Sequence, residues 1–104
     1  MTTTIETGFG SRLMTNGGFL LNNELTDFSF KTFINGKKIA NNIEPGKRPR
    51  SSMSPTIILK NNKPLYVLGS PGGSNIIGYV VNAIVALIDW KLNAQEAASI
   101  PHGI

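Results

Sequence analysis

Two short runs of β-branched and aromatic residues near the middle of the chain predict a β-hairpin. The runs are Thr56–Leu59 and Leu65–Leu68, and between them lies a polar segment with two adjacent asparagines. Asparagine tolerates the positive φ angles of a tight two-residue turn, so Asn61 and Asn62 suit its tip. The pattern predicts antiparallel strands over about residues 56–68.

A longer apolar segment follows and predicts a buried helix over about residues 74–90. Apolar residues cover most of its helical surface instead of one stripe, so the helix must be covered on several sides. Ser74 is a suitable N-cap for it. The few strands expected in this chain cannot supply that cover. We therefore expect the rest of the packing to come from another polypeptide or from sequence outside this chain.

The remaining segments predict short elements joined by loops. Residues 2–6 alternate weakly and predict a strand, and Phe19–Leu21 is a short apolar run typical of a buried strand. Between Ser29 and Arg50 the periodicity fades, so mainly loop is expected. Asn93 followed by Glu96 forms a capping-box pattern and predicts a second short helix.

Composition excludes several classes of site. The chain has no cysteine and one histidine, which excludes a thiolate metal site and a serine–histidine relay within it, and we expect no metal and no cofactor. Net charge is +4, but the only dense basic run is Lys47–Arg50, without the interleaved aromatics of a polyanion-binding surface. The apolar helix is shorter than the roughly 20 residues of a membrane span. Neither nucleic acid nor membrane is an expected partner.

One candidate chemical element is a pair of carboxylates. Glu24 and Asp27 are three residues apart, so they share a face only if the chain turns helically between them. On one face they could bind an ammonium group, an attraction of about 4 kcal/mol per contact before desolvation. The alternative is a solvated turn in which Asp27 is a cap. Spacing alone does not decide between the two.

Two further elements could bind anionic groups. Ser51 and Ser52 offer paired hydroxyls that could donate to a carboxylate, although such serines are often ordinary turn residues. Gly72 and Gly73 lie between a predicted strand and a predicted helix, where closely approaching backbone N–H groups could stabilise an oxyanion. The alternative is a plain strand-to-helix turn, since the spacing of a phosphate loop is absent.

Taken in order, these elements resemble the small subunit of γ-glutamyltransferases. The matching segments are Leu20–Ser29, Glu44–Thr56 and Gly69–Ser74, together with Phe9–Ser11, Ile88–Trp90 and Asn93–Ala97. The resemblance implies an α+β fold, part of the αββα sandwich of N-terminal-nucleophile hydrolases. In that family a self-cleaved precursor exposes an N-terminal threonine, which attacks the γ-amide of glutathione or another γ-glutamyl compound. An amino acid, peptide or water then accepts the γ-glutamyl group.

The resemblance also implies roles for individual residues. Thr4 matches a threonine whose hydroxyl supports the nucleophile, and Glu6 joins Glu24 and Asp27 as contacts to the substrate's α-amino group. The others contact negatively charged oxygens: Ser51 and Ser52 at the α-carboxylate, Gly72 and Gly73 at the oxyanion hole.

Several residues and segments of the family pattern are missing from this chain. The nucleophilic threonine is expected upstream of Met1. The arginine that pairs with the substrate's α-carboxylate is expected on the large subunit, and the large subunit is the expected partner of this chain. Residues 1–104 are thus expected to be a partial small-subunit domain without the nucleophile segment and the C-terminal remainder. Lys31–Asn42 is shorter than the tyrosine-bearing lid of many members, so no lid residue is assigned. The alternatives are a truncated, catalytically inactive fragment or an acylase relative. The localisation is unknown from this chain, and the resemblance implies a periplasmic or secreted protein.

Overall fold

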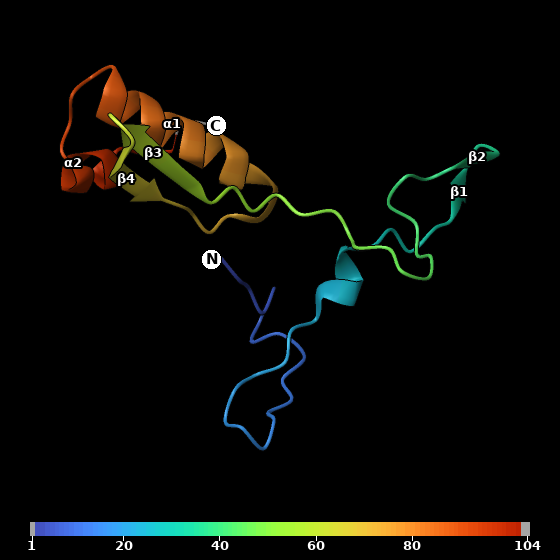
Figure 1. The fold of residues 1–104 in the computed structure, drawn as a ribbon. Helices are drawn as coiled ribbons and strands as arrows, with labels where there is room; N and C mark the ends of the chain where they lie inside the picture. Colours follow the sequence, from blue (N-terminus) through green and yellow to red (C-terminus); the bar gives the residue numbers. More distant parts are fainter. Residues whose placement is uncertain (1, 103–104) are drawn as a thin grey trace. The chain divides into compact units, whose positions relative to one another are not determined.

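The computed structural model describes residues 2–102, which mix helices and strands in two compact units (Figure 1). The N-terminal unit, Thr3–Ser51, contains a 3₁₀ helix η1 (Glu24–Asp27) and the two-residue strands β1 (Phe33–Ile34) and β2 (Lys37–Lys38). The C-terminal unit is formed mainly by the residues from Ser52 onward. Its elements are β3 (Thr56–Lys60), β4 (Lys63–Leu68), η2 (Gly73–Asn75), α1 (Ile76–Ile88) and α2 (Ala94–Ser99).

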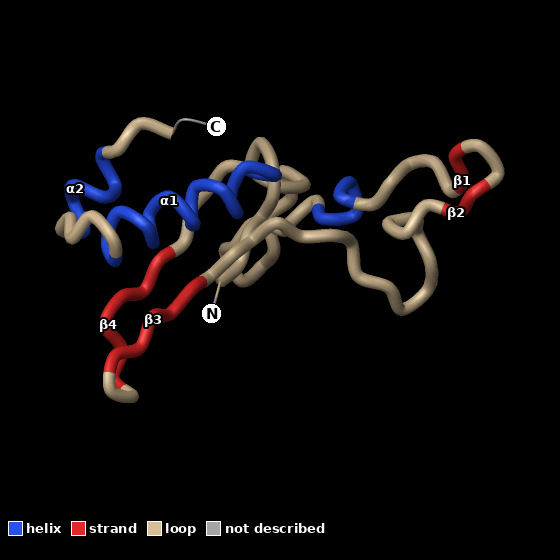
Figure 2. The backbone as a smooth tube through the Cα atoms, turned by 90° about the horizontal axis from the view of Figure 1, so that it is seen from above, coloured by secondary structure: helices blue, strands red, loops and turns tan. Residues whose placement is uncertain are grey.

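The predicted hairpin is confirmed. Strands β3 and β4 pair antiparallel, from Thr56 opposite Leu68 to Lys60 opposite Lys63. The turn consists of Asn61 and Asn62, with φ angles of 53° and 59°, so both asparagines adopt the left-handed conformation that a tight hairpin turn requires. Figure 2 traces its two red strands joined by a tan turn.

The central helix is confirmed with a later start, and the prediction that Ser74 caps it is wrong. Ser74 lies within η2, and Asn75 is the N-cap of α1, although its side chain accepts no capping hydrogen bond from the helix backbone. The physical reason is the glycine pair before it: Gly72 and Gly73 have φ angles of 134° and 57°, and the chain leaves them in a 3₁₀ turn.

Helix α1 is buried along one side only within the described residues. Ile76, Val80, Ala86 and Leu87 are buried, whereas Ile77 and Val81 on the other side are 56% and 51% exposed. The short helix α2 packs against α1. No helix within residues 2–102 is long and apolar enough to cross a lipid bilayer.

The capping box of α2 is confirmed. The Asn93 side chain accepts a hydrogen bond from the backbone N–H of Glu96 at 2.9 Å. The Glu96 carboxylate accepts in return from the backbone N–H of Asn93 at 2.8 Å. Two backbone donors at the start of the helix are therefore satisfied reciprocally.

Both strands predicted in the N-terminal unit are wrong. Residues 2–6 form no strand, and Phe19–Leu21 contributes only an isolated bridge between Met14 and Leu20, with Phe19 62% exposed. The backbone adopts positive φ at Glu6, where an extended strand cannot continue. Short apolar runs form strands only when a neighbouring strand pairs with them, and none of the described residues pairs with residues 2–6.

The segment Ser29–Arg50 is mainly loop, as predicted, except for one small hairpin. Strands β1 and β2 pair antiparallel through a turn at Asn35–Gly36, with φ angles of 49° and 74°. An Asn-Gly pair is a strong signal for such a turn. The Asn35-Gly36 pair was therefore a sequence signal for this hairpin, although its strands are too short to show an alternating hydrophobic pattern.

Gly10 provides a test of how closely the N-terminal unit is packed. It is buried with a φ of 60°, and a Cβ atom there would lie 2.3 Å from the carbonyl oxygen of Leu21 and 2.7 Å from that of Ile5. We expect Gly10→Ala to lower the free energy of opening of this unit by about 2 kcal/mol more than Gly8→Ala does. The measurement is native-state amide hydrogen exchange at Ser11 and Leu21, whose N–H groups are bonded within the unit.

Gly8→Ala is the matched control. Gly8 has the same φ of 60°, but nothing lies within 4 Å of the added Cβ atom. Both variants carry the same backbone strain, so the difference between them reports the contact with the two carbonyl oxygens. Equal losses in the two variants would contradict the packing described here.

Candidate functional site

Three carboxylates converge in the N-terminal unit. One oxygen atom from each of Glu6, Glu24 and Asp27 lies within 4.8 Å of the others, and all three residues are half-buried. Helix η1 makes the turn that brings Glu24 and Asp27 onto one face. The helical alternative for this pair is therefore the one that the structure adopts.

Glu6 reaches the cluster from a strained backbone. Its φ is 69°, a conformation that is uncommon for residues other than glycine and asparagine. The Thr4 hydroxyl oxygen accepts a hydrogen bond from the N–H of Glu6 at 2.9 Å, and the Thr7 hydroxyl donates to Glu6 Oε1 at 3.1 Å. Thr4 thus restrains the backbone of Glu6 and Thr7 its carboxylate. Backbone strain of this kind is concentrated at binding sites.

Helix η1 is fixed at both of its ends. At its start, the Asn22 side chain accepts from the N–H of Glu24 at 3.0 Å. At its end, Phe28 is buried, with 5% of its surface exposed. The carbonyl oxygen of Asp27 accepts a hydrogen bond from Asn41 Nδ2 at 2.6 Å. The carboxylates of η1 are therefore presented by a restrained turn.

The cluster changes the ionisation of one member. Burial, and then a hydrogen bond to Asp27 and the charges of Asp27 and Glu6, raise the pKa of Glu24 above its usual range. Among the described residues, Glu24 Oε1 is buried without a hydrogen-bond partner. A carboxyl group in these surroundings favours either a proton or a cation.

The arrangement suits a small cation with several donors. Carboxylate oxygens are ligands for hard metal ions, and they also accept hydrogen bonds from an ammonium group. An ammonium has three N–H donors, one for each carboxylate of the cluster. The geometry therefore accommodates a primary amine as well as it accommodates a metal ion.

The predicted serines lie in the linker that leads into β3. Ser51 is exposed and Ser52 is half-buried. The Ser54 hydroxyl donates to the carbonyl oxygen of Ser52 at 3.0 Å, and the Thr56 hydroxyl donates to that of Ser54 at 3.1 Å. Successive side-chain to backbone bonds thus restrain the segment that follows the serine pair.

The predicted oxyanion residues form the turn before α1. Gly72 has a φ of 134°, and a Cβ atom there would lie 2.6 Å from the ring of Tyr79, so only glycine fits without a shift. Within residues 2–102, no acceptor is bonded to the N–H of Gly72 or Gly73. Both amides are therefore free to donate to an anionic oxygen.

The predicted site residues divide between the two units. The N-terminal unit contains Thr4, Glu6, Glu24, Asp27 and Ser51, and the C-terminal unit contains Ser52, Gly72 and Gly73. The C-terminal unit also has a groove of about 450 Å³ between β4, α1 and α2, where the rings of Tyr79 and His102 stack 3.9 Å apart. None of the predicted site residues lines this groove.

Sequence patterns missed two contributors to the carboxylate cluster. Glu6 is far from η1 in the chain, and no spacing rule connects it to Glu24; only the family resemblance singled it out. Asn41 was not singled out at all, because its partners are backbone groups that leave no trace in a side-chain pattern.

Comparisons with known proteins agree with the resemblance noted in the sequence. The family model described as gamma-glutamyltranspeptidase matches residues 1–103. The glutathione hydrolase proenzyme of Escherichia coli is 44% identical over 97% of this chain, and that of Bacillus subtilis is 46% identical over 96%. The chain spans only 18% and 16% of the length of these two relatives. A solved Helicobacter pylori gamma-glutamyltranspeptidase mutant has a TM-score of 0.81 and 51% identity, over 98% of this chain and 58% of that one.

The raised pKa of Glu24 predicts a pH dependence of stability. The folded state binds this proton more tightly than the unfolded state, so Glu24 lowers stability as the pH rises from its usual pKa through the raised one. We expect Glu24→Gln to remove this loss, so that the variant gains stability relative to the parent chain over this range. Urea unfolding followed by circular dichroism, from about pH 4 to pH 7, measures the difference.

Glu44→Gln is a control of opposite sign in the same unit. Hydrogen bonds from Lys38 and Asn42, together with the charge of Lys38, lower the pKa of Glu44. Glu44 therefore stabilises the fold above its usual pKa, and its replacement should cost stability as the pH rises. Parallel pH profiles for the two variants would contradict the ionisation state assigned to Glu24.

Proposed function

This chain belongs to the γ-glutamyltranspeptidase family, and from that membership we propose that it forms part of an enzyme that transfers or hydrolyses γ-glutamyl groups. Its part is the pocket that holds the γ-glutamyl substrate. The substrate class is glutathione and related γ-glutamyl compounds, in keeping with the glutathione hydrolases that the chain resembles. The large-subunit portion of the same enzyme is the proposed partner, and the αββα sandwich is the proposed complete fold.

The observation that carries the proposal is the convergence of Glu6, Glu24 and Asp27. A γ-glutamyl compound presents an α-ammonium group at the end remote from its scissile amide. Each carboxylate–ammonium contact at 4 Å contributes about 4 kcal/mol before desolvation at an effective dielectric constant near 20. The ammonium also supplies a positive charge to a cluster in which the pKa of Glu24 is raised by burial, by its hydrogen bond to Asp27 and by the neighbouring carboxylates. The cluster is therefore suited to this headgroup.

The remaining roles rest on the match of the sequence to the family. Ser51 and Ser52 donate their hydroxyl protons to the α-carboxylate. The N–H groups of Gly72 and Gly73 donate to the oxygen of the γ-carbonyl as it becomes negatively charged. Free donors at such a position are worth about 3–4 kcal/mol each in well-studied enzymes.

The proposed reaction proceeds by acyl transfer. A threonine hydroxyl attacks the γ-carbonyl carbon, its proton passes to the threonine's own α-amino group, and a tetrahedral oxyanion forms. The oxyanion collapses, the C–N bond breaks, and the leaving amine takes the proton. Water or an amino group then attacks the γ-glutamyl ester and releases the threonine. Thr4 supports the nucleophile in this proposal, in addition to holding Glu6.

An acylase relative is the second candidate, and the carboxylate cluster argues against it. A glutaryl substrate has the same chain as a γ-glutamyl substrate but lacks the α-amino group. Three converging carboxylates without a cationic partner would repel each other in a glutaryl complex. The cluster therefore favours a substrate with an ammonium group.

Asp27→Asn in the processed enzyme that contains this chain tests the headgroup assignment. The substitution keeps the shape and removes the charge, and the affected contact is the same in the ground state and the transition state. We expect the KM for γ-glutamyl-p-nitroanilide to rise about tenfold to a hundredfold, with a smaller change in kcat. Asp89→Asn, at the exposed C-terminal end of α1, is the matched control and should leave both constants unchanged. Equal effects of the two substitutions refute the assignment.

The 104-residue polypeptide by itself is proposed to lack transferase activity. In this proposal Thr2 lies away from the catalytic terminus, so removal of Met1 does not create the nucleophile. We expect no release of nitroaniline from γ-glutamyl-p-nitroanilide by the purified chain. Release that Thr2→Ala abolishes would falsify this proposal.

A further inference from the structure

We propose that Asn41 is a positioning residue that fixes the distance between the two parts of the pocket that bind the substrate headgroup. The inference rests on the proposed function and extends it to a residue outside the predicted site. One part is the carboxylate turn η1, which binds the α-ammonium. The other is the segment that begins at Arg50 and continues into Ser51, which binds the α-carboxylate.

The amide side chain of Asn41 bonds to the backbone of both parts. Its Nδ2 donates to the carbonyl oxygen of Asp27 at 2.6 Å. Its Oδ1 accepts from the backbone N–H of Arg50 at 2.9 Å. Asp27 and Arg50 are far apart in the chain, so this one side chain connects two segments that share no regular secondary structure. Arg50 directly precedes Ser51.

The backbone of Asn41 is held as well. Its carbonyl oxygen accepts from the N–H of Ser29 at 2.9 Å, which adds a second bond between the Asn41 region and the end of η1. The next residue, Asn42, is 2% exposed and forms a parallel bridge with Ser29. The position of the Asn41 side chain is therefore set by its surroundings.

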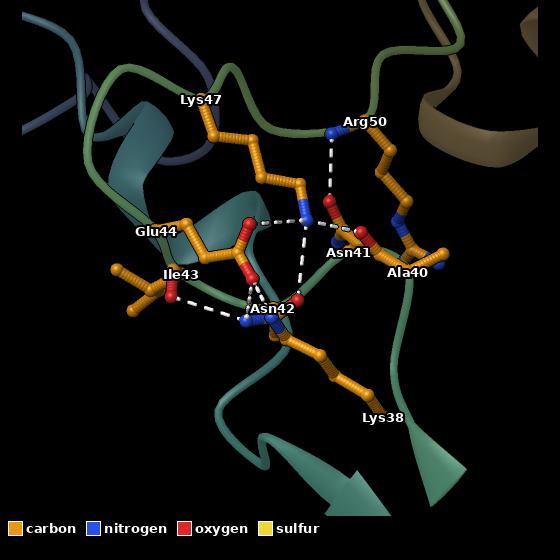
Figure 3. Close-up of polar contacts among 8 residues, drawn as sticks. All are labelled: Lys38, Ala40, Asn41, Asn42, Ile43, Glu44, Lys47 and Arg50. Atoms are coloured by element: carbon orange, nitrogen blue, oxygen red, sulfur yellow. Dashed lines mark hydrogen bonds and ion pairs between the residues drawn. The ribbon is translucent and has the colours of Figure 1, made fainter.

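A network of polar contacts centred on the next residue, Asn42, restrains the loop that contains Asn41. Figure 3 draws these contacts. Asn42 Nδ2 donates to Glu44 Oε1 at 3.2 Å, and Lys47 Nζ donates to Asn42 Oδ1 at 3.2 Å. Lys47 also donates to the carbonyl oxygen of Ala40, and Lys38 forms an ion pair with Glu44. The loop thus keeps Asn41 in place without a hydrophobic core of its own.

A fixed distance matters because a glutamyl headgroup carries its ammonium and its carboxylate on the same carbon atom. Both groups bind together only if the two parts of the pocket are correctly spaced. A substrate without the ammonium uses the serine side alone and does not depend on that spacing. The role of Asn41 therefore predicts a substrate-dependent effect, which a general loss of stability does not produce.

The test compares two donors with the processed enzyme that contains this chain. For Asn41→Ala we expect kcat/KM for γ-glutamyl-p-nitroanilide to fall about tenfold, mainly through KM, as the loss of two hydrogen bonds implies. For glutaryl-p-nitroanilide, which lacks the α-amino group, we expect a change below about twofold. The ratio of the two kcat/KM values is the readout.

Asn16→Ala is the matched control. Asn16 is an exposed turn residue in the same unit, and it lies outside the proposed pocket. We expect this substitution to leave the ratio unchanged. An unchanged ratio in Asn41→Ala overturns the positioning role, whether kcat/KM falls equally for both donors or for neither. An equal fall for both donors indicates structural damage. A parent enzyme that turns over neither donor overturns the proposed function, and the positioning role with it.

Amide hydrogen exchange at Arg50 tests the link itself, independently of activity. In Asn41→Ala the Arg50 amide loses its acceptor, and we expect its exchange to become about tenfold faster. Asn41→Asp retains an oxygen that accepts from this amide, but replaces the donor to Asp27 by a second oxygen. Its Arg50 amide should remain protected while the donor ratio still falls. Unchanged exchange in Asn41→Ala refutes the link.

Discussion

The convergence of Glu6, Glu24 and Asp27 is the constraint that the rest of the N-terminal unit accommodates. One oxygen atom from each carboxylate lies within 4.8 Å of the others, and burial, followed by a hydrogen bond to Asp27 and the charges of Asp27 and Glu6, raises the pKa of Glu24. The fold supports the cluster through a strained Glu6 backbone and a 3₁₀ turn bonded at both ends. Structure that maintains an unfavourable arrangement of this kind indicates a binding site rather than a stabilising contact.

The supports of this cluster are polar because the N-terminal unit has little apolar core. Phe28 is its buried aromatic side chain, and Asn42 is buried beside the loop network. Asparagine and threonine side chains bonded to backbone groups take over the role that apolar packing has in larger domains. Such hydrogen bonds are directional, so they fix the positions of the carboxylates. Each contributes only modestly to the stability of the unit. The exposed Ile77 and Val81 of α1 show the same shortage of cover in the C-terminal unit.

The parts of the fold that could be predicted from the sequence are those that local chemistry determines. The Asn61–Asn62 turn and the Asn93–Glu96 capping box each need only neighbouring residues, and both were confirmed. The strand predicted at Phe19–Leu21 failed because a strand requires a partner that the apolar pattern does not identify. At the site, the three-residue spacing of Glu24 and Asp27 allowed two interpretations, a helical turn that pairs their carboxylates and a solvated turn. Asn41 was beyond sequence reasoning, since it bonds to the backbone of Asp27 and Arg50.

In the proposed function, the raised pKa of Glu24 links substrate binding to proton release. The raised pKa means that Glu24 retains a proton to a higher pH than an isolated carboxyl group does, whereas the α-ammonium of the proposed substrate brings a positive charge to the cluster. The substrate and the proton therefore compete for the same cluster, and affinity for the ammonium falls as the pH decreases through the raised pKa. The proposed preference for a γ-glutamyl headgroup over a glutaryl one rests on the same competition, because a neutral methylene neither displaces the proton nor offsets the charge.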